Sequence, residues 1–582
     1  MKLIDYYDKE INYFLRESVK FAQKYDEQAK ALNLEDAQHQ DPYTERLIEA
    51  FAFLTANIKQ KLDDGFIDLA YQLLEIISPH YLYPIPSCVI LEFKPDLSFV
   101  NESVIEKGTP IETKSTNPTC SFQTCSSLKI RPIDIQSIQQ VQINARNVIK
   151  ILLSTKKYKV DWNKFSKDPL TVFINGSHQS VYNLYELLIL DIEYVIIRWT
   201  KMNGETAEKQ LPSEKIIQSI VENPDRDYSL LQYPDNSFSG YRLIEDYFFF
   251  ARKFFFFEMD VLSITNEIKD DSDIELSLVS TGNKQWDIEI DKNTLKLNCI
   301  PAINIFEQKH GSVSFEHDDS ELYHKIEVDY AYSNYILPHH ITDVTGLCIE
   351  DGKRYNYYPL SSYKHQTTDN SDSYFHTKQN INIDNKFELF IGIVRSPERK
   401  TESISVKLMC FNDETLLEQI PMGDICSTTT PDFPDNVTVK NITKPEKPLF
   451  TQLNSQDLWA LINTLSLNYF SLKNIDQLKN MLLLYNRRQT YANKKKIMSI
   501  ESIYINTCRQ LIKGYPVTGL SIDIVLNSKI FTSKGEMLLF AQVLSRLLSM
   551  YVPINTFCNC IISEKDGEKL WEMEIPGKKI IL

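Results

Sequence analysis

The chain has 582 residues with a formal net charge of −15, 43% hydrophobic residues, ten cysteines and only 16 glycines. This composition is typical of a globular protein that is long enough for several domains and needs neither disulfides nor metals to fold. The acidic charge argues against a nucleic-acid-binding protein, which neutralises phosphates with a basic face, and the few glycines argue against a phosphate-binding loop.

Residues 1–86 predict a helical region. Tyr7, Ile11 and Phe14 recur at steps of four and three residues, which places them on one face of a first helix. Asp41 is a suitable N-cap for a second helix, with Pro42 at its first position.

An apolar stripe of the same spacing continues on the second helix, at Leu47, Phe51, Leu54 and Ile58. A third, short helix is expected at about residues 67–77. Such stripes need partner helices, which belong either to this chain or to another one.

After Pro84 and Pro86 the pattern changes to short strands separated by turns, beginning with a strand at 87–96. We expect a β-rich domain at 87–235 and an α+β or β-rich domain at 236–426, with few helices, one of them at 182–189. Threonine and proline at 427–450 predict a linker. Residues 451–582 predict an α/β domain, so the fold class is α+β and multidomain.

The segment 239–257 is unusually rich in aromatic residues. Gly240 suits a close approach at a helix start, and Tyr241, Tyr247 and Phe248 lie on one face of that helix. After Lys253 a strand is expected, with Phe254 and Phe256 on one face and Phe255 and Phe257 on the other. Both faces must then be covered, either by the core of a domain, which we favour, or by another protein.

No catalytic motif is present. His339, His340 and Asp343 come nearest to a metal site, but neighbouring residues on a strand point apart, which argues against a shared metal. The cysteine spacings match no zinc site. The basic runs at 487–488 and 494–496 are expected to be solvated. We therefore expect no cofactor, no metal and no enzymatic activity.

Export and membrane insertion are not expected either. Charged residues, among them Asp5, Asp8 and Lys9, lie where a signal peptide would be apolar, and no run reaches 18 apolar residues. Scattered cysteines fit a reducing cytoplasm.

The segment "LLQYPDNSFSGYRLIEDYFFFARKFFFFEM" at 230–259 resembles the signature of the TssF family (also called VasA or ImpG) of type VI secretion systems, and further segments resemble the family in the same order. "YYDKEINYFLRE", "DPYTERLIEAFAFL" and "LLEIISPHYLYPIPS" resemble its earlier segments. The chain departs from the family pattern at Ala251-Arg252 and at 410–416, where the resemblance leaves a local turn and a loop contact open.

The resemblance implies a structural wedge subunit of a baseplate, with a fold like the wedge proteins of contractile tails. Its implied partners are TssG, a second TssF copy, TssK, TssE and the VgrG spike, in the cytoplasm at the inner-membrane complex. The N-terminal helices are expected to join TssG helices in a bundle. The alternatives are a wedge protein of a related contractile injection device or phage tail and, more remotely, a metal-dependent enzyme.

The candidate interaction or structural residues are therefore Tyr7, Ile11, Phe14, Leu47, Phe51, Leu54 and Ile58 on the N-terminal helices, and Gly240, Tyr241, Arg242, Tyr247, Lys253, Phe254 and Phe256 in the aromatic segment.

Overall fold

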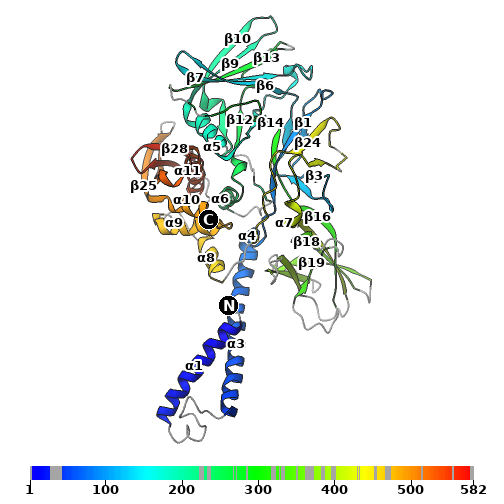
Figure 1. Cartoon of the computed structure of the whole chain (residues 1–582), viewed down its shortest axis with the longest axis vertical. Coiled ribbons are helices and arrows are strands. Elements are labelled where there is room, and N and C mark those ends of the chain that lie inside the picture. Colours follow the sequence, from blue (N-terminus) through cyan, green and yellow to red (C-terminus); the bar gives the residue numbers. More distant parts are fainter. Residues whose placement is uncertain are drawn as a thin grey trace. The chain divides into compact units, whose positions relative to one another are not determined.

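The computed structural model shows a mainly β, multidomain chain with helical segments (Figure 1). It divides into two compact units, Met1–Pro79 with Leu453–Ser466, and His80–Gln452 with Leu467–Leu582. The structure describes residues 3–25, 42–221, 229–231, 238–265, 268–269, 272–282, 286, 288–315, 323–326, 328, 335–348, 352–360, 373–381, 387–394, 402–428, 430–431, 433–450, 455–465, 473–512, 515–553 and 556–576.

The described part of the first unit contains the helices α1 (Leu3–Lys24), α3 (Pro42–Ile77) and α8 (Ser455–Leu465). α3 packs against both α1 and α8. The separate helix predicted at 67–77 is wrong, because α3 is continuous and contains Gly65 in its interior. A glycine there costs only about 1 kcal/mol, which the packing of a long helix overcomes.

A six-stranded sheet opens the second unit, and its core contains Leu91, Phe93 and Val439. The linker predicted at 427–450 is wrong. The composition of this segment indicated turns, but Val439 lies in a strand that pairs with the 87–96 strand. Strands from both sides of the predicted boundary at 235 also share this sheet. Its order is β23 (Ile425–Ser427), β3 (Pro110–Thr113), β4 (Ser121–Thr124), β15 (Cys299–Ile303), β1 (Cys88–Pro95) and β24 (Val437–Asn441).

A five-stranded antiparallel sheet contains a tight hairpin at its edge. Asn144 and Ala145 adopt positive φ of 50° and 63°, which is the two-residue turn that matches the twist of paired strands. Residues 134–154 therefore form two strands joined by this turn. The sheet order is β10 (Thr206–Pro212), β9 (Ile192–Thr200), β13 (Asp273–Ser280), β7 (Arg146–Ser154) and β6 (Asp134–Ile143).

The aromatic segment forms a helix, a short 3-10 turn and a strand. These are α6 (Ser239–Phe249), the turn Ala251–Phe254 and β12 (Phe256–Met259). The expected change from helix to strand is confirmed, although Phe254 belongs to the turn. β12 lies in a four-stranded sheet of order β11 (Ile217–Ser219), β12, β8 (Leu170–Ile174) and β14 (Leu295–Leu297), and the helix α5 (His178–Glu186) contacts β8.

Two further sheets come from the middle of the chain. A two-stranded sheet pairs β2 (Ser103–Ile105) with β5 (Leu128–Ile130). A seven-stranded sheet has its own apolar core and is followed by the short helix α7 (Glu414–Leu417). Its order is β16 (Phe306–Phe315), β22 (Glu402–Asn412), β18 (Ile336–Cys348), β19 (Arg354–Pro359), β20 (Ser373–Ile381), β21 (Phe387–Val394) and β17 (His324–Lys325).

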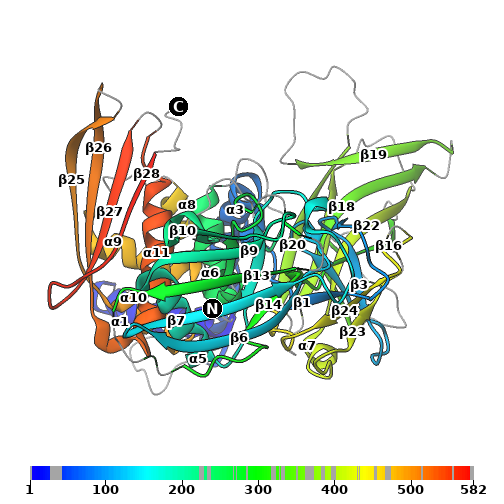
Figure 2. The same cartoon turned by 90° about the horizontal axis from the view of Figure 1, so that it is seen from above.

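The C-terminal part is the expected mixture of helices and strands. α11 (Lys534–Ser549) is buried along its length and contacts a four-stranded sheet on one side and α5 and α6 elsewhere (Figure 2). The strand β25 was not predicted. The sheet order is β25 (Ile500–Ile512), β26 (Tyr515–Leu526), β27 (Phe557–Glu564) and β28 (Lys569–Pro576), and the remaining helices are α4 (Pro79–Leu82), α9 (Ile475–Tyr485) and α10 (Tyr491–Met498).

Candidate functional site

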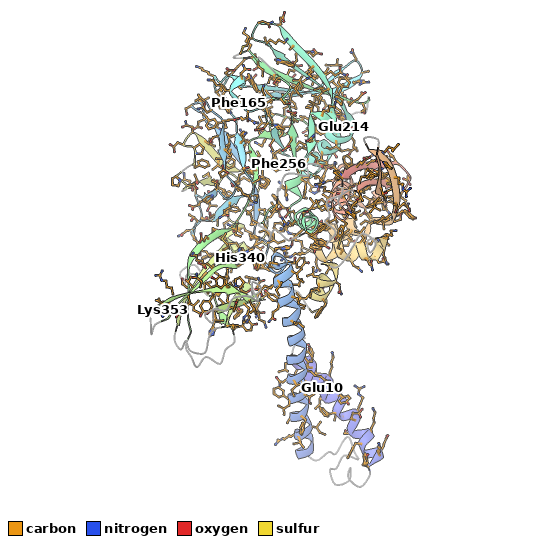
Figure 3. The ribbon with its side chains drawn as sticks, turned by 180° about the vertical axis from the view of Figure 1, so that it is seen from behind. Glu10, Phe165, Glu214, Phe256, His340 and Lys353 are labelled. Atoms are coloured by element: carbon orange, nitrogen blue, oxygen red, sulfur yellow. The ribbon has the colours of Figure 1, made fainter. Side chains whose placement is uncertain are left out.

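A partly buried polar contact joins the two N-terminal helices. Glu10 of α1 is buried, and Lys59 of α3 donates a hydrogen bond of 2.5 Å to its Oε1 (Figure 3). The predicted α1 residues Tyr7, Ile11 and Phe14 are half-buried. This face of α1 is thus partly covered within the described chain.

The predicted stripe on α3 is exposed. Leu47, Phe51, Leu54 and Ile58 lie on one helical face, and between 54 and 59% of each residue is accessible to solvent. Ala52 and Ala56, in contrast, are fully buried. An apolar face of this kind on a stable helix is a feature of protein–protein contact surfaces.

At the start of α6, Gly240 permits close packing against α11. A Cβ at this position would lie 2.5 Å from the Phe238 ring and 2.9 Å from Leu547 Cδ1. The next residue, Tyr241, stacks on Tyr485 of α9 with ring centroids 4.5 Å apart, and its hydroxyl lies 2.7 Å from that of Tyr551. These two signature residues therefore hold three helices together.

The phenylalanines that follow are all buried. Phe256 packs on Phe173 of β8 at 4.7 Å, and Phe257 on the opposite face packs on Tyr185 of α5 at 5.3 Å (Figure 3). Phe254 contacts the ring of Tyr247, at 6.1 Å between centroids. Within the described chain, both faces of this strand are covered by its own domain.

Lys253 is also buried, where it forms an ion pair with Asp246 of α6. Arg242, four residues before Asp246, is half-buried. Burial and the positive charges of Arg487 and Arg242 lower the pKa of His80 to about 3. His80 is therefore neutral at physiological pH.

The prediction that the basic runs at 487–488 and 494–496 are solvated is wrong for two of their residues. Arg487 is buried: its Nη1 lies 2.8 Å from Glu245 Oε1 of α6, and its Nη2 donates to the Tyr83 carbonyl at 2.6 Å. Lys496 of α10 lies 2.7 Å from Glu536 of α11. Both cations are buried because carboxylates from helices distant in sequence pair with them.

The two neighbouring histidines also differ from expectation. A β-bulge between Pro338 and His340 turns both side chains to the same side, and their Nδ1 atoms lie 2.6 Å apart. His339 Nε2 lies 2.9 Å from the Pro84 carbonyl oxygen, and His340 stacks on Tyr83 (Figure 3). The argument that their side chains point apart is thus wrong.

These histidines are nevertheless not joined by Asp343, which instead pairs with Lys407 at 3.0 Å. Burial lowers the pKa of His340 to about 4, and burial and His340 lower that of His339. Among the described residues, no group of three or more histidine, cysteine or acidic side chains could hold a metal. Burial also raises the pKa of Cys120 to about 11 and that of Cys125 to about 12, so these thiols are protonated.

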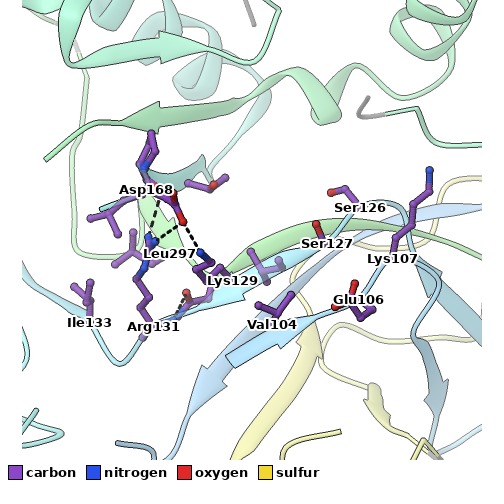
Figure 4. Close-up of a pocket in the computed structure, with 15 residues that line it drawn as sticks. Val104, Glu106, Lys107, Ser126, Ser127, Lys129, Arg131, Ile133, Asp168 and Leu297 are labelled. Carbon is purple, nitrogen blue, oxygen red and sulfur yellow. Dashed lines mark hydrogen bonds and ion pairs between the residues drawn. The ribbon is translucent and has the colours of Figure 1, made fainter. Parts of the chain in front are cut away.

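A cavity of about 620 Å³ lies beside β5 (Figure 4). Arg131, which is buried, contacts Glu102 at 3.3 Å and Asp168 at 3.7 Å, and Lys129 also pairs with Asp168. Although partial burial opposes it, hydrogen bonds from Ser166 and Arg131 lower the pKa of Glu102. The charges at this end of the cavity are thus matched by internal partners.

A family model described as "Type VI secretion system, TssF" matches residues 1–577. The chain belongs to the TssF family. The type VI secretion system component TssF1 of Pseudomonas aeruginosa is 25% identical over 630 residues, which cover 99% of each chain.

Two solved structures share the fold of this TssF chain. A chain of the TssK-TssF-TssG baseplate subcomplex, solved by cryo-electron microscopy, matches with a TM-score of 0.75 and 21% identity over 92% of this chain and 99% of its own length. A chain of a complex described as the baseplate complex from the type VI secretion system matches with a TM-score of 0.60 and 20% identity over 100% of both chains.

In this TssF chain, the sequence-predicted residues fall in three places: a half-buried face of α1, an exposed stripe on α3 and an aromatic cluster around α6, which is buried except for the half-buried Arg242. Sequence reasoning missed Arg487 and its partner Glu245, which are 242 residues apart. No local pattern marks such a pair, since only the fold brings the two helices together. Among the described residues, no helix is long and apolar enough to cross a membrane.

Proposed function

We propose that this chain is a structural wedge subunit of a type VI secretion baseplate, with no catalytic role. The observation that supports this most directly is the exposed stripe of Leu47, Phe51, Leu54 and Ile58 on α3. A large apolar face gains free energy when a partner helix covers it, at roughly 25 cal/mol per Å² buried. The fold shared with a chain of the TssK-TssF-TssG baseplate subcomplex supports the same role.

In this proposal the α3 stripe binds helices of TssG, and TssK joins the same complex. A second copy of this chain, TssE and the VgrG spike complete the baseplate, which forms in the cytoplasm and docks on the inner-membrane complex. The predicted regions 1–86, 87–235, 236–426 and 451–582 remain part of this proposal only as surfaces that contact different partners.

The proposal is tested by co-expression with the TssG-like protein of the same system, followed by size-exclusion chromatography with light scattering. We expect a stable complex with two copies of this chain for each TssG. The variant Phe51→Glu/Leu54→Glu places two charges in the apolar contact, so we expect it to remain folded and to lose TssG.

A matched control is Tyr491→Glu/Leu511→Glu, which changes two exposed apolar residues of the other unit. It should bind TssG as the unchanged chain does. If both double variants bind equally well, α3 does not carry the TssG contact.

The alternatives make different predictions for the same experiment. A wedge protein of another contractile device would form no complex with TssG and would bind the wedge partner of that device. A metal-dependent enzyme would be purified with about one metal ion per chain, which we do not expect, because the described part of the chain offers the two buried histidines no third ligand.

A further inference from the structure

A second cavity, the lysine cavity, has a volume of about 130 Å³ and lies in the larger unit, where strands of three sheets meet. Its lining is basic, although the whole chain carries a net charge of −15. Four lysines and two carboxylates line it: Lys94, Lys157, Lys292 and Lys296, with Glu92 and Asp134.

Glu92 lies at the centre of this charge cluster. Its oxygens are 3.0 Å from Lys296 Nζ, 3.5 Å from Lys440 Nζ and 3.7 Å from Lys94 Nζ. Lys94 shares a face of β1 with Glu92, Lys440 lies opposite Glu92 on β24, and Lys296 comes from β14 of the neighbouring sheet. One carboxylate therefore faces three ammonium groups.

This arrangement keeps like charges close together. Burial lowers the pKa of Lys94, and the ammonium groups of Lys440 and Lys296 lower it further against the effect of Glu92. Lys94 and Lys440 remain accessible, with 53% and 43% of their side chains exposed, whereas Glu92 is 7% exposed. An added anion would relieve this repulsion from the solvent side.

The larger cavity beside β5 is different. There Asp168 pairs with both Lys129 and Arg131 (Figure 4). Arg131 also pairs with Glu102. The two cavities share Ile133, Leu297 and Asn298 in their linings. A chain segment anchored at the lysines can thus extend into the larger cavity, whereas a small ion bound at the lysines does not reach it.

We propose that the lysine cavity binds a carboxylate side chain of an acidic segment from a protein partner, and that the adjoining cavity receives an apolar residue of the same segment. Val104, which is exposed, and Leu128 supply apolar lining there. The site lies in a different unit from α3, so it does not rest on TssG binding.

The test uses the full-length protein and a fluorescein-labelled hexapeptide of alternating glutamate and leucine, followed by fluorescence anisotropy. The variant Lys94→Met/Lys440→Met removes the two more exposed of the three ammonium groups that face Glu92 and leaves the Lys296–Glu92 pair in place. We expect its Kd for the peptide to rise about tenfold. Binding to the unchanged protein should weaken as salt is raised.

Lys209→Met/Lys529→Met is the matched control, because both lysines are exposed and lie on other elements. It should bind the peptide normally, and a peptide with glutamine in place of glutamate should bind neither protein. Circular dichroism checks folding, and Lys94→Gln/Lys440→Gln replaces the methionine variant if that variant is unfolded. Equal affinity of the lysine variant and its control, absence of peptide binding, or binding of inorganic phosphate alone would each overturn the proposal.

Discussion

Arg487 and Glu245 form an ion pair that is almost fully buried, with 1% and 3% of their side chains exposed. Arg487→Met leaves the Glu245 carboxylate in the core without this cation, which costs about 3–5 kcal/mol of stability. We expect a clear fall in the melting temperature measured by calorimetry. The double variant Arg487→Met/Glu245→Leu should recover most of it, since two apolar side chains replace the pair.

Arg488 is the natural control for this experiment. It is the next residue in the chain, but its ion pair with Glu446 is partly exposed. Arg488→Met should cost no more than about 1 kcal/mol. If Arg487→Met and Arg488→Met have the same melting temperature, the buried pair does not stabilise the fold as argued here.

Gly240 gives a second prediction, about packing. Gly240→Ala would place a methyl group 2.5 Å from the Phe238 ring, and overpacking of this kind costs about 1–3 kcal/mol. We expect a lower melting temperature than for Gly282→Ala, because a Cβ at Gly282 would meet nothing within 4 Å. A melting temperature for Gly240→Ala at or above that of Gly282→Ala would contradict this prediction.

The bulge in β18 makes that element sensitive to acid. Because burial lowers the pKa of His340 to about 4 from an ordinary value of 6.5, the unfolded chain binds a proton at a pH where the folded chain does not. Stability is therefore full above pH 6.5 and falls as the pH decreases towards 4. The lowered pKa of His339 acts in the same direction.

We expect His340→Gln to reduce this loss of stability in melting curves recorded at several pH values between 6.5 and 4. His178, which is exposed at the start of α5, provides the control variant His178→Gln. Identical pH dependence for both variants would show that the histidines of β18 do not contribute to acid sensitivity.

At the level of elements, local patterns predicted what local forces decide. The strand 87–96, the helix at 182–189 and the helix that begins at Pro42 are each confirmed, because alternation and periodicity act within a few residues. The predicted N-cap, Asp41, lies outside the described residues. The exposed α3 stripe follows from the same periodicity. The bulge at His339 and the hairpin turn at Asn144-Ala145 escaped notice, since neither has a strong turn residue such as glycine.

On the scale of the whole molecule, α8 belongs to the same unit as α1 and α3. Leu458 and Leu461 of α8 are buried, and α3 is its main contact. A chain that begins at His80 should therefore expose both leucines, bind a hydrophobic dye and self-associate. Light scattering measures the self-association and dye fluorescence measures the exposed apolar surface. Leu458→Ser/Leu461→Ser should suppress both signals in the shortened chain. A shortened chain that is already monomeric, and whose signals the double substitution does not change, would contradict this prediction.

The arrangement of the sheets was the part that the sequence could not predict. β1 pairs with β15 and β24, which lie roughly 200 and 340 residues later, and such pairings leave no signal in local composition. For the same reason the composition of the segment 427–450, which is rich in proline and threonine, predicts a linker, although the strand in this segment completes a sheet. The buried pairs at Arg487 and Lys496 depend on the same long-range assembly.

The position of α8 also has a consequence for synthesis. At 5–20 residues per second, α8 is completed between about 20 and 75 s after α3 has left the ribosome. During that interval α3 has α1 beside it but lacks α8, the second helix that it packs against in the finished fold. The helical unit thus finishes folding late, and a nascent chain carries α3 without this second contact for most of its time on the ribosome.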